Sequence, residues 1–251
     1  MSALSRFLRQ KGILPQKNRG QPKFDYIGDG VGVLGKSLDF LKDPKFVAAW
    51  EFTSRGNDGS WPGGTPDVRW RAHMACWAAS HGLNLEGDFV ECGVNTGLFS
   101  MTICHYLDFN KIDKNLYLFD TYAGIPLQDL SGSELEHAQE INSHYFDCFA
   151  IATENFKPYP NAKLVKGMLP QSLADAPLGK IAYLSVDLNN SVAEKGVIEA
   201  LWPRLTPSAI VLIDDYAFAG LGPQKAMWDA FARSQNRMVA TLPTGQGLLI
   251  R

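Results

Sequence analysis

The chain lacks the features that would place it in a bilayer, in an oxidising compartment or on nucleic acid. No apolar run reaches the roughly 18 residues that a membrane-spanning helix needs. The four cysteines lie far apart without a Cys-x-x-Cys pair, which argues against a disulfide framework or a zinc site and favours a reducing, cytoplasmic setting. The formal net charge is only −2, so no global charge attracts nucleic acid. The N-terminus also lacks an apolar signal core followed by a small-residue cleavage site.

Apolar residues, in contrast, are plentiful and follow regular patterns. They make up 45% of 251 residues, enough for one large α/β domain with an N-terminal addition. We expect a basic arm and Gly-rich loop over residues 1–35, a helical extension over 36–86, and the main ligand-binding domain over 87–251. Apolar spacing in the extension predicts one helix over Ser37–Trp50 and another from Pro66 or Asp67 to about Gly82.

Three N-terminal segments are predicted to be irregular. Residues 1–23 carry six basic and no acidic side chains, which predicts a solvated arm, with binding to a partner or a membrane surface as the alternative. Four glycines in residues 28–35 predict a loop. Residues 54–66 are rich in Gly, Pro, Asp and Asn, and predict a loop or lid around Trp61.

From Gly87 onward, strand and helix patterns alternate. Two strands close the chain, and the short turn between them requires antiparallel pairing. The order predicts an α/β, Rossmann-like fold with a mostly parallel sheet of seven strands and an antiparallel C-terminal hairpin. The expected strands are 88–92, 116–120, 162–166, 181–187, 209–214, Arg237–Leu242 and Gly247–Arg251, and the expected helices are 98–108, 134–155, 192–202 and 223–234.

The segment from Gly87 to Asp120 has the pattern of a nucleoside-binding half-site. A short apolar strand containing Glu91 runs into a turn bounded by Gly93 and Gly97, and glycines allow the backbone to approach a ligand closely. The next strand ends in Asp120, an acid that can accept both ribose hydroxyls. The alternative is an ordinary strand-to-helix turn that happens to contain glycines.

This turn differs from the dinucleotide fingerprint Gly-x-Gly-x-x-Gly, whose glycines serve a pyrophosphate. A carboxylate at Glu91 repels phosphate and attracts an ammonium or sulfonium group. The expected ligand is therefore S-adenosylmethionine, a nucleoside with a cationic amino-acid tail. The expected cofactor-binding residues follow the first three strands of the main domain: Glu91, Cys92, Gly93, Asn95, Gly97, Asp120, Thr121, Gly167 and Met168.

Two further strands end in acids, at Asp187 and at Asp214-Asp215. The carboxyl ends of parallel strands meet at the ligand-binding edge of a sheet, so these carboxylates are expected to lie together. Such a cluster needs a cation or shared protons to relieve its repulsion, and Mg²⁺ prefers oxygen ligands. We therefore predict Mg²⁺ at Asp187, Asp214 and Asp215, with a neutral oxygen from Asn189 or Asn190 as a possible addition. The alternative is an Asp-Asp pair that only caps the next turn.

A metal-held hydroxyl needs a base, and Asp187 is the first choice. His144 and His73 are the other candidates, although a lone histidine is more often structural. Arg71 is predicted either to face the cofactor's carboxylate or an acceptor, or to point into water. The polar segment 121–147 is long enough to cover the site and to influence acceptor choice.

Three motifs together resemble the macrocin O-methyltransferase family: Gly87–Val94, Leu118–Pro126 and Val211–Tyr216. The similarity covers roughly residues 67–251. It implies a class I, S-adenosylmethionine-dependent and Mg²⁺-dependent enzyme that methylates a hydroxyl of a small-molecule acceptor, such as a sugar or glycoside in natural-product or glycan biosynthesis. It also implies a homo-oligomer, a dimer or larger, assembled through N-terminal elements.

The resemblance assigns roles position by position. Glu91 and Gly93 match the cofactor loop, and Asp120 matches the ribose-binding acid. Asp187 matches an acid that binds metal and acts as base, and the Asp214-Asp215 pair matches two metal ligands. The family usually continues after the Asp187 position with Gly-Asp and an aromatic residue, whereas this chain has Leu188-Asn189-Asn190.

Sequence reasoning leaves three functions open. The leading one is metal-dependent O-methyl transfer. A nicotinamide-dependent oxidoreductase would need a turn that accepts phosphate, which Glu91 disfavours. The third is a non-catalytic binding or scaffold protein that retains the fold and engages a partner through its basic arm and Trp61 loop.

Overall fold

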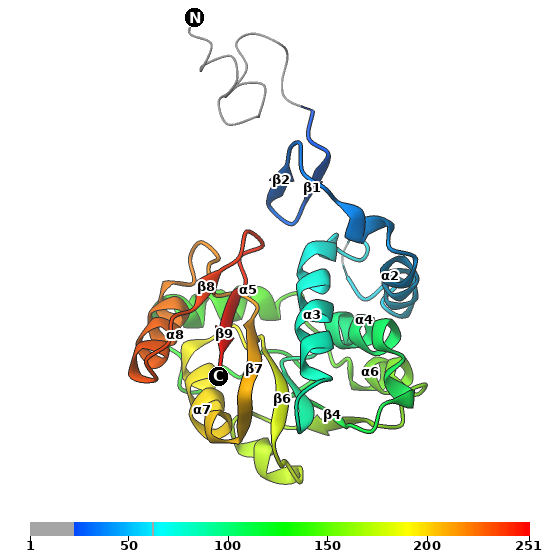
Figure 1. The fold of residues 1–251 in the computed structure, drawn as a ribbon. Coiled ribbons are helices and arrows are strands. Elements are labelled where there is room, and N and C mark those ends of the chain that lie inside the picture. The colour runs from blue at the N-terminus through cyan, green and yellow to red at the C-terminus, as the bar shows by residue number, and fades with distance from the viewer. Residues whose placement is uncertain (1–22, 62) are drawn as a thin grey trace, which may run out of the picture.

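The computed structural model describes residues 23–61 and 63–251 (Figure 1). The basic arm predicted over residues 1–23 therefore lies almost wholly outside the described residues. No helix within the described ranges is long and apolar enough to cross a membrane. The domain limits proposed at residues 36 and 87 remain predictions.

The centre of residues 63–251 is a mixed sheet with strand order β5-β4-β3-β6-β7-β9-β8. The first five of these strands are parallel, and β9 runs antiparallel to both β7 and β8. This confirms the predicted α/β fold with seven strands and an antiparallel C-terminal pair. The strands are β3 (Asp88–Cys92), β4 (Leu116–Asp120), β5 (Ala162–Lys166), β6 (Ile181–Val186), β7 (Leu205–Ile213), β8 (Ala240–Thr241) and β9 (Gly247–Ile250).

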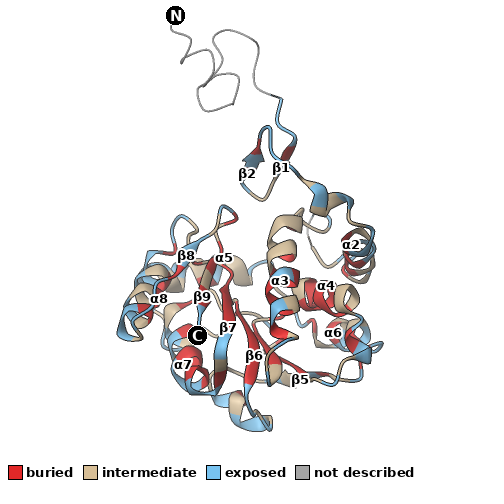
Figure 2. Cartoon of the chain, in the orientation of Figure 1, coloured by how far each residue is buried: buried red, intermediate tan, exposed pale blue. Residues whose placement is uncertain are grey.

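Helices cover both faces of this sheet, and the central strands β3, β4 and β6 are therefore buried on both sides (Figure 2). Successive residues of β3 separate the two cores: Phe89 packs with α2, α3, α4 and α6, whereas Val90 and Cys92 pack with α7 and α8. The α-helices are α2 (Pro44–Gly56), α3 (Arg69–Gly82), α4 (Leu98–Leu107), α5 (Gly132–Asn142), α6 (Phe149–Phe156), α7 (Ser191–Leu201) and α8 (Gly222–Ser234), and the 3-10 helices are η1 (Asp39–Lys42), η2 (Phe109–Lys111), η3 (Gln171–Asp175) and η4 (Trp202–Arg204).

The predicted loop over residues 28–35 is partly wrong, because β1 (Tyr26–Gly28) and β2 (Val31–Val33) form an antiparallel hairpin there. Its turn is Asp29-Gly30, with φ angles of 51° and 71°. Two successive positive φ angles match the twist of paired strands, and Asp-Gly is a favoured sequence for such a turn. The hairpin stands at one end of the molecule (Figure 1), where Tyr26, Val31 and Val33 form a small apolar cluster with Trp70.

Two helix predictions also need correction. The helix expected over Ser37–Trp50 begins later and runs further, as α2, because Pro44 suits a first helical position and Asp43 caps the helix by accepting from Lys45 N at 3.0 Å. The single helix expected over 134–155 is two helices, α5 and α6. The break follows Asn142, whose side-chain amide exchanges two 2.8 Å hydrogen bonds with the backbone of Ile125 and so fixes the chain away from a helical path.

Candidate active site

A cavity of about 250 Å³ opens at the carboxyl ends of the parallel strands. The chain passes from β3 to β4 on one side and later returns to β6 on the other, so β3 and β6 flank the switch point where such sheets bind ligands. Most of the predicted site residues line this cavity. They are Glu91, Gly93, Asn95, Asp120, Thr121, Gly167, Met168, Asp187 and Asp214.

Four predicted site residues lie elsewhere. The side chain of Cys92 is buried in the core formed with α7 and α8, so only its backbone could reach a ligand. Gly97 begins α4, and His144 is exposed in the turn after α5. The structure therefore does not bring His144 to the cavity. Asp215 is half-buried beside Asp214, and burial together with the Asp214 charge raises its pKa to about 8.

The glycines of the first turn are also required for packing within the protein, whereas their predicted approach to a ligand stays a prediction. Gly93 has a φ of 91°, and a Cβ atom there would lie 1.7 Å from the carbonyl oxygen of Asp187. A Cβ atom on Gly97 would lie 2.5 Å from the ring of Phe156. Both glycines thus permit close packing of protein against protein, at the end of β6 and on α6 respectively.

Asp120, at the end of β4, forms hydrogen bonds to the backbone of the turn that follows β3. One carboxylate oxygen accepts the backbone N–H groups of Val94 at 2.5 Å and Asn95 at 2.7 Å, and the other accepts that of Tyr122 at 2.7 Å. The Thr121 hydroxyl also lies 3.4 Å from this second oxygen, but it is closer to the Gly124 carbonyl oxygen, at 2.6 Å. If the hydroxyl donates to Gly124, one of the roughly four acceptor sites of the carboxylate remains for a ligand hydroxyl. Asp120 also lines the cavity, which keeps the predicted contact with a ribose open.

Glu91 is buried on the α4 side of β3, where its carboxyl accepts a hydrogen bond from the Ser100 hydroxyl. Burial raises its pKa to about 8. Without a ligand, the carboxyl is therefore mostly protonated at neutral pH, which differs from the fixed negative charge assumed from the sequence. A cationic ligand would favour the ionised form and lower this pKa again.

The acids at the ends of β6 and β7 form a crowded group. Asp187 accepts from Asn189 Nδ2 at 3.0 Å, and its pKa is raised by burial and by the charges of Asp214 and Asp215. Asp214 accepts from Gln246 Nε2 at 3.0 Å through one oxygen. The carboxylates of Asp187, Asp214 and Asp215 therefore raise one another's cost of ionisation, which a nearby positive charge would reduce.

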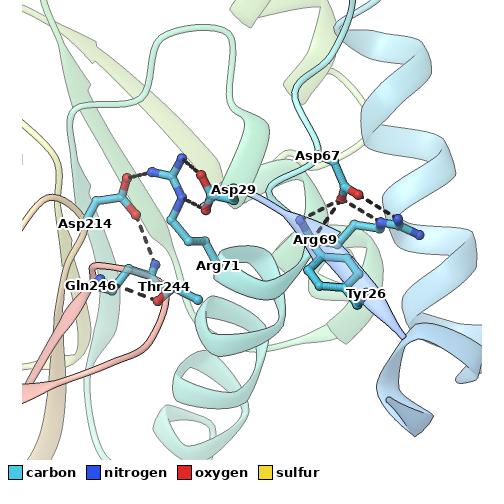
Figure 3. A network of polar contacts seen from close by, with 8 residues as sticks. All are labelled: Tyr26, Asp29, Asp67, Arg69, Arg71, Asp214, Thr244 and Gln246. Carbon is cyan, nitrogen blue, oxygen red and sulfur yellow. Dashed lines mark hydrogen bonds and ion pairs between the residues drawn. The ribbon is translucent and has the colours of Figure 1, made fainter. Parts of the chain in front are cut away.

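Arg71 in the first turns of α3 supplies a counterion from within the protein (Figure 3). Its Nη1 donates to Asp214 Oδ2 at 2.5 Å, while Nε and Nη2 donate to the two oxygens of Asp29 at 2.7 and 3.0 Å. The guanidinium lines the cavity and also lies 5.4 Å from the ring centre of Phe218. Arg71 is thus directed into the site, which was one of the two predicted orientations. Arg69, two residues earlier, instead pairs with Asp67 away from the cavity.

These acids have the right kind of ligand atom for Mg²⁺, but they are not arranged as a metal site. Its carboxylate oxygens are the ligand type that Mg²⁺ prefers, and no hydrogen bond to the Asp215 side chain occurs among the described residues. Across residues 23–61 and 63–251, however, no three His, Cys, Asp or Glu side chains are close enough together to hold a metal as they stand. Both oxygens of Asp214 also have protein partners, since one accepts from Arg71 and the other from Gln246.

Several aromatic side chains also line the cavity: Trp61, Phe99, Tyr122, Tyr145 and Phe146. The indole N–H of Trp61 is buried without a hydrogen-bond partner in the described structure. The predicted covering segment does lie over the site. Gln128 donates to the sulfur of Met168 at 2.7 Å, and Glu134 of α5 accepts from Ser191 N at 2.6 Å.

Glu194 holds the backbone that follows Asp187, a role that the sequence analysis did not predict. This buried carboxyl accepts from Trp228 Nε1 at 2.6 Å, Gln224 Nε2 at 2.9 Å and Leu188 N at 3.3 Å. It therefore joins α7 and α8 to the residue that follows Asp187. The Asn190 amide, predicted as a possible metal ligand, instead caps α7 by accepting from Ala193 N at 2.8 Å.

The strand order and the ligand cavity at the switch point define a class I methyltransferase fold. The O-methyltransferase NovP shares this fold, with a TM-score of 0.65 at 22% identity over 80% of this chain and 87% of that one. The profile described as Macrocin-O-methyltransferase (TylF) matches residues 67–242, which is more than half of the chain. The chain belongs to this family, as its motifs suggested.

Two curated relatives are sugar O-methyltransferases by name. One is the 8-demethyl-8-(2,3-dimethoxy-alpha-L-rhamnosyl)-tetracenomycin-C 4'-O-methyltransferase of Streptomyces olivaceus, 26% identical over 53% of this chain and 54% of that protein. The other is the Mycinamicin III 3''-O-methyltransferase of Micromonospora griseorubida, 25% identical over 53% of this chain and 56% of that protein. The chain thus spans about half the length of the relatives it matches.

Proposed function

We propose that the protein is an S-adenosylmethionine-dependent O-methyltransferase that acts on a hydroxyl of a sugar or glycoside. The observation that supports this proposal is one cavity lined by both predicted groups of acids. Glu91 and Asp120, the predicted nucleoside-binding acids, line it together with Asp187 and Asp214, the predicted acids of the acceptor site. Membership of an O-methyltransferase family supports the same conclusion.

At the cofactor end, Asp120 would accept a ribose hydroxyl while it holds the Val94–Asn95 turn in place. Glu91 would face the cationic tail. Met168, next to Gly167 after β5, would pack beside the adenine ring. Bound S-adenosylmethionine would supply the methyl group on its sulfonium.

At the acceptor end, Asp187 would take the proton of the attacking hydroxyl. Burial and the neighbouring carboxylates raise its pKa, which makes the ionised Asp187 a stronger base than an ordinary carboxylate. The aromatic wall of Trp61, Phe99 and Tyr145 would hold the apolar face of a sugar ring and exclude water. We further propose that Asp187, Asp214 and Asp215 hold Mg²⁺, which when bound would lower the pKa of an acceptor hydroxyl.

A homo-oligomer in the cytoplasm is part of the same proposal. The β1–β2 hairpin presents Ile27 and Leu34 with 71% and 52% of their surfaces exposed, and apolar side chains of this kind suit a contact with another copy. Light scattering of the full chain would measure the assembly, and a monomer at all concentrations would contradict it.

A thermal-shift panel tests the cofactor assignment. S-adenosylhomocysteine and NAD are each added with and without Mg²⁺, and a ligand at 100 times its Kd stabilises by about 2.7 kcal/mol. We expect a shift with S-adenosylhomocysteine and none with NAD. Stabilisation by NAD alone would favour an oxidoreductase, and no shift with either nucleoside would favour a non-catalytic protein.

Asp187→Asn then tests the chemistry. The variant keeps the size of the side chain but cannot take the proton, so methyl transfer to glycoside acceptors, followed by mass spectrometry, should be lost. Binding of S-adenosylhomocysteine should stay within severalfold of the unaltered protein. Full turnover in this variant would remove Asp187 from the proposed role.

A further inference from the structure

We propose that Tyr145 is a further catalytic residue, whose hydroxyl donates a hydrogen bond to the acceptor oxygen that attacks the methyl group. The inference rests on the proposed function, because it takes this cavity as the site of methyl transfer. Tyr145 lies in the segment between α5 and α6, and its side chain lines the cavity.

Backbone contacts on both sides of Tyr145 fix its position. Before it in the chain, the Asn142 amide exchanges two 2.8 Å hydrogen bonds with the backbone of Ile125. After it, Cys148 N donates to the carbonyl oxygen of Tyr122 at 2.9 Å. Both contacts attach the segment to the chain that follows β4, so a well-held backbone presents the Tyr145 side chain to the cavity.

The Tyr145 hydroxyl is available to a ligand. Among residues 23–61 and 63–251 it forms no hydrogen bond, although a phenol can both donate and accept. Tyr122, which also lines the cavity, donates instead to the carbonyl oxygen of Leu118 at 2.9 Å. Half-buried polar groups normally have a partner, and for Tyr145 a bound molecule can provide it.

The charges around Tyr145 come from both groups of acids. Burial raises the pKa of its hydroxyl above the usual range, and the charges of Asp187 and then Asp120 raise it further. The phenol therefore stays protonated at neutral pH and serves as a donor, not as a base. Asp187 is the proposed base and Asp120 the proposed ribose contact, so the hydroxyl lies where the charges of both proposed sites act on it.

This place suits a donor to the attacking oxygen. Asp187 takes the acceptor's proton, the new carbon–oxygen bond forms, and the bond from the methyl carbon to sulfur breaks with its electron pair left on sulfur. Tyr145 keeps its own proton throughout. Its hydrogen bond would orient the oxygen towards the methyl carbon and stabilise the negative charge that develops before the new bond is complete.

Binding of a cofactor analogue tests the position of the hydroxyl without an acceptor. Sinefungin carries an ammonium group where S-adenosylmethionine carries its methyl, whereas S-adenosylhomocysteine has nothing there. Tyr145→Phe should weaken sinefungin binding by about tenfold, the effect of one hydrogen bond to a charged group, and should change S-adenosylhomocysteine binding less than twofold. Tyr106→Phe is the matched control, because Tyr106 is also half-buried but lies outside the cavity, and it should change neither affinity.

Kinetics test the role in the reaction. With p-nitrophenyl α-L-rhamnoside and p-nitrophenyl β-D-glucoside as acceptors, Tyr145→Phe should lower kcat by about 100-fold and change the acceptor KM less than threefold. A raised KM with an unchanged kcat would leave Tyr145 as a wall residue and overturn the proposal. If the unaltered protein methylates neither glycoside, the ratio of the sinefungin and S-adenosylhomocysteine affinities decides.

A crystal structure with sinefungin provides a measurement that needs no variant. Tyr145 Oη should lie within about 3.2 Å of the ammonium nitrogen, and a separation above about 4 Å would overturn the proposal even if Tyr145→Phe does not fold. An unchanged ratio of the two affinities would overturn it as well. If the unaltered protein does not bind S-adenosylhomocysteine, the proposed function itself fails, whereas binding of this compound with no effect of Tyr145→Phe removes only the role of Tyr145.

Discussion

Gly93 and the carbonyl oxygen of Asp187 are so close that a Cβ atom on residue 93 would lie 1.7 Å from that oxygen. The contact joins the end of β3 to the end of β6, on either side of the switch point. The first turn and the proposed base therefore cannot shift independently. Any side chain at position 93 displaces the backbone of Asp187.

Gly93→Ala should consequently be much more damaging than an ordinary glycine substitution. Gly220 is a matched control, because its φ of 96° is close to the 91° of Gly93 but a Cβ atom there would meet nothing within 4 Å. Gly220→Ala should cost about 1 kcal/mol from backbone strain alone. Gly93→Ala should cost roughly 3 kcal/mol more, a loss of about 6 to 12 °C in Tm. Equal melting temperatures would show that the two strand ends can separate at little cost.

The Glu91 carboxyl should make cofactor binding depend on pH. Its pKa is about 8 without ligand, so binding the sulfonium compound below that pH must release a proton. Affinity for S-adenosylmethionine should then rise with pH from 6 to 8, by up to about tenfold per unit. The Glu91→Gln side chain can still accept a hydrogen bond from Ser100 but does not titrate. This variant should therefore lose the part of the pH dependence of affinity that is due to the protein. Calorimetry in buffers of different ionisation enthalpy would count the protons released on binding. The same pH dependence of affinity in the unaltered protein and in Glu91→Gln would contradict this assignment.

The same group affects the stability of the ligand-free protein. Its folded-state pKa lies above the value near 4.3 expected when unfolded, so its contribution is complete at low pH and is lost as pH rises through about 8. The unfolding free energy of Glu91→Gln should fall less than that of the unaltered protein between pH 5 and 8. Denaturant titrations across this range measure the difference.

Glu194 should be important to stability because three donors depend on it. Glu194→Ala leaves Trp228 Nε1, Gln224 Nε2 and Leu188 N without their acceptor and should cost about 3 kcal/mol. Glu199→Ala on the same helix is the control, because Glu199 is exposed and pairs with Lys195 at 3.9 Å, and it should change stability by less than about 0.5 kcal/mol. Chemical denaturation of both variants provides the comparison, and similar losses would contradict the inferred role of Glu194.

The unpaired indole N–H of Trp61 should contribute to acceptor binding. Trp61→Phe keeps an aromatic ring but removes the donor, so the KM for the acceptor should rise by about tenfold. Binding of S-adenosylhomocysteine should change less than twofold, because the predicted cofactor contacts lie on other segments. Steady-state kinetics and calorimetry separate the two effects, and an unchanged KM would leave Trp61 as a wall residue only.

The sheet could be predicted from the sequence because its central strands are short apolar runs separated by regular turn signals. The strand-end positions of Glu91, Asp120 and Asp187 followed from the same pattern. The contacts of Arg71 could not be predicted, since its partners Asp29 and Asp214 are 42 and 143 residues away in the chain. The raised pKa of Glu91 could not be predicted either, because its burial beneath α4 is a property of the packed structure.

The polar contacts of Asp214 bring the two ends of the described chain to one carboxylate. Asp29 reaches it through Arg71 from the N-terminal hairpin, and Gln246 reaches it directly from the turn before β9. The family profile covers residues 67–242 and includes neither Asp29 nor Gln246. A fragment cut at those limits would keep Asp187, Asp214 and Asp215 but would leave the Asp214 side chain bonded to Arg71 alone, so the contacts that hold this carboxylate extend beyond the region that identifies the family.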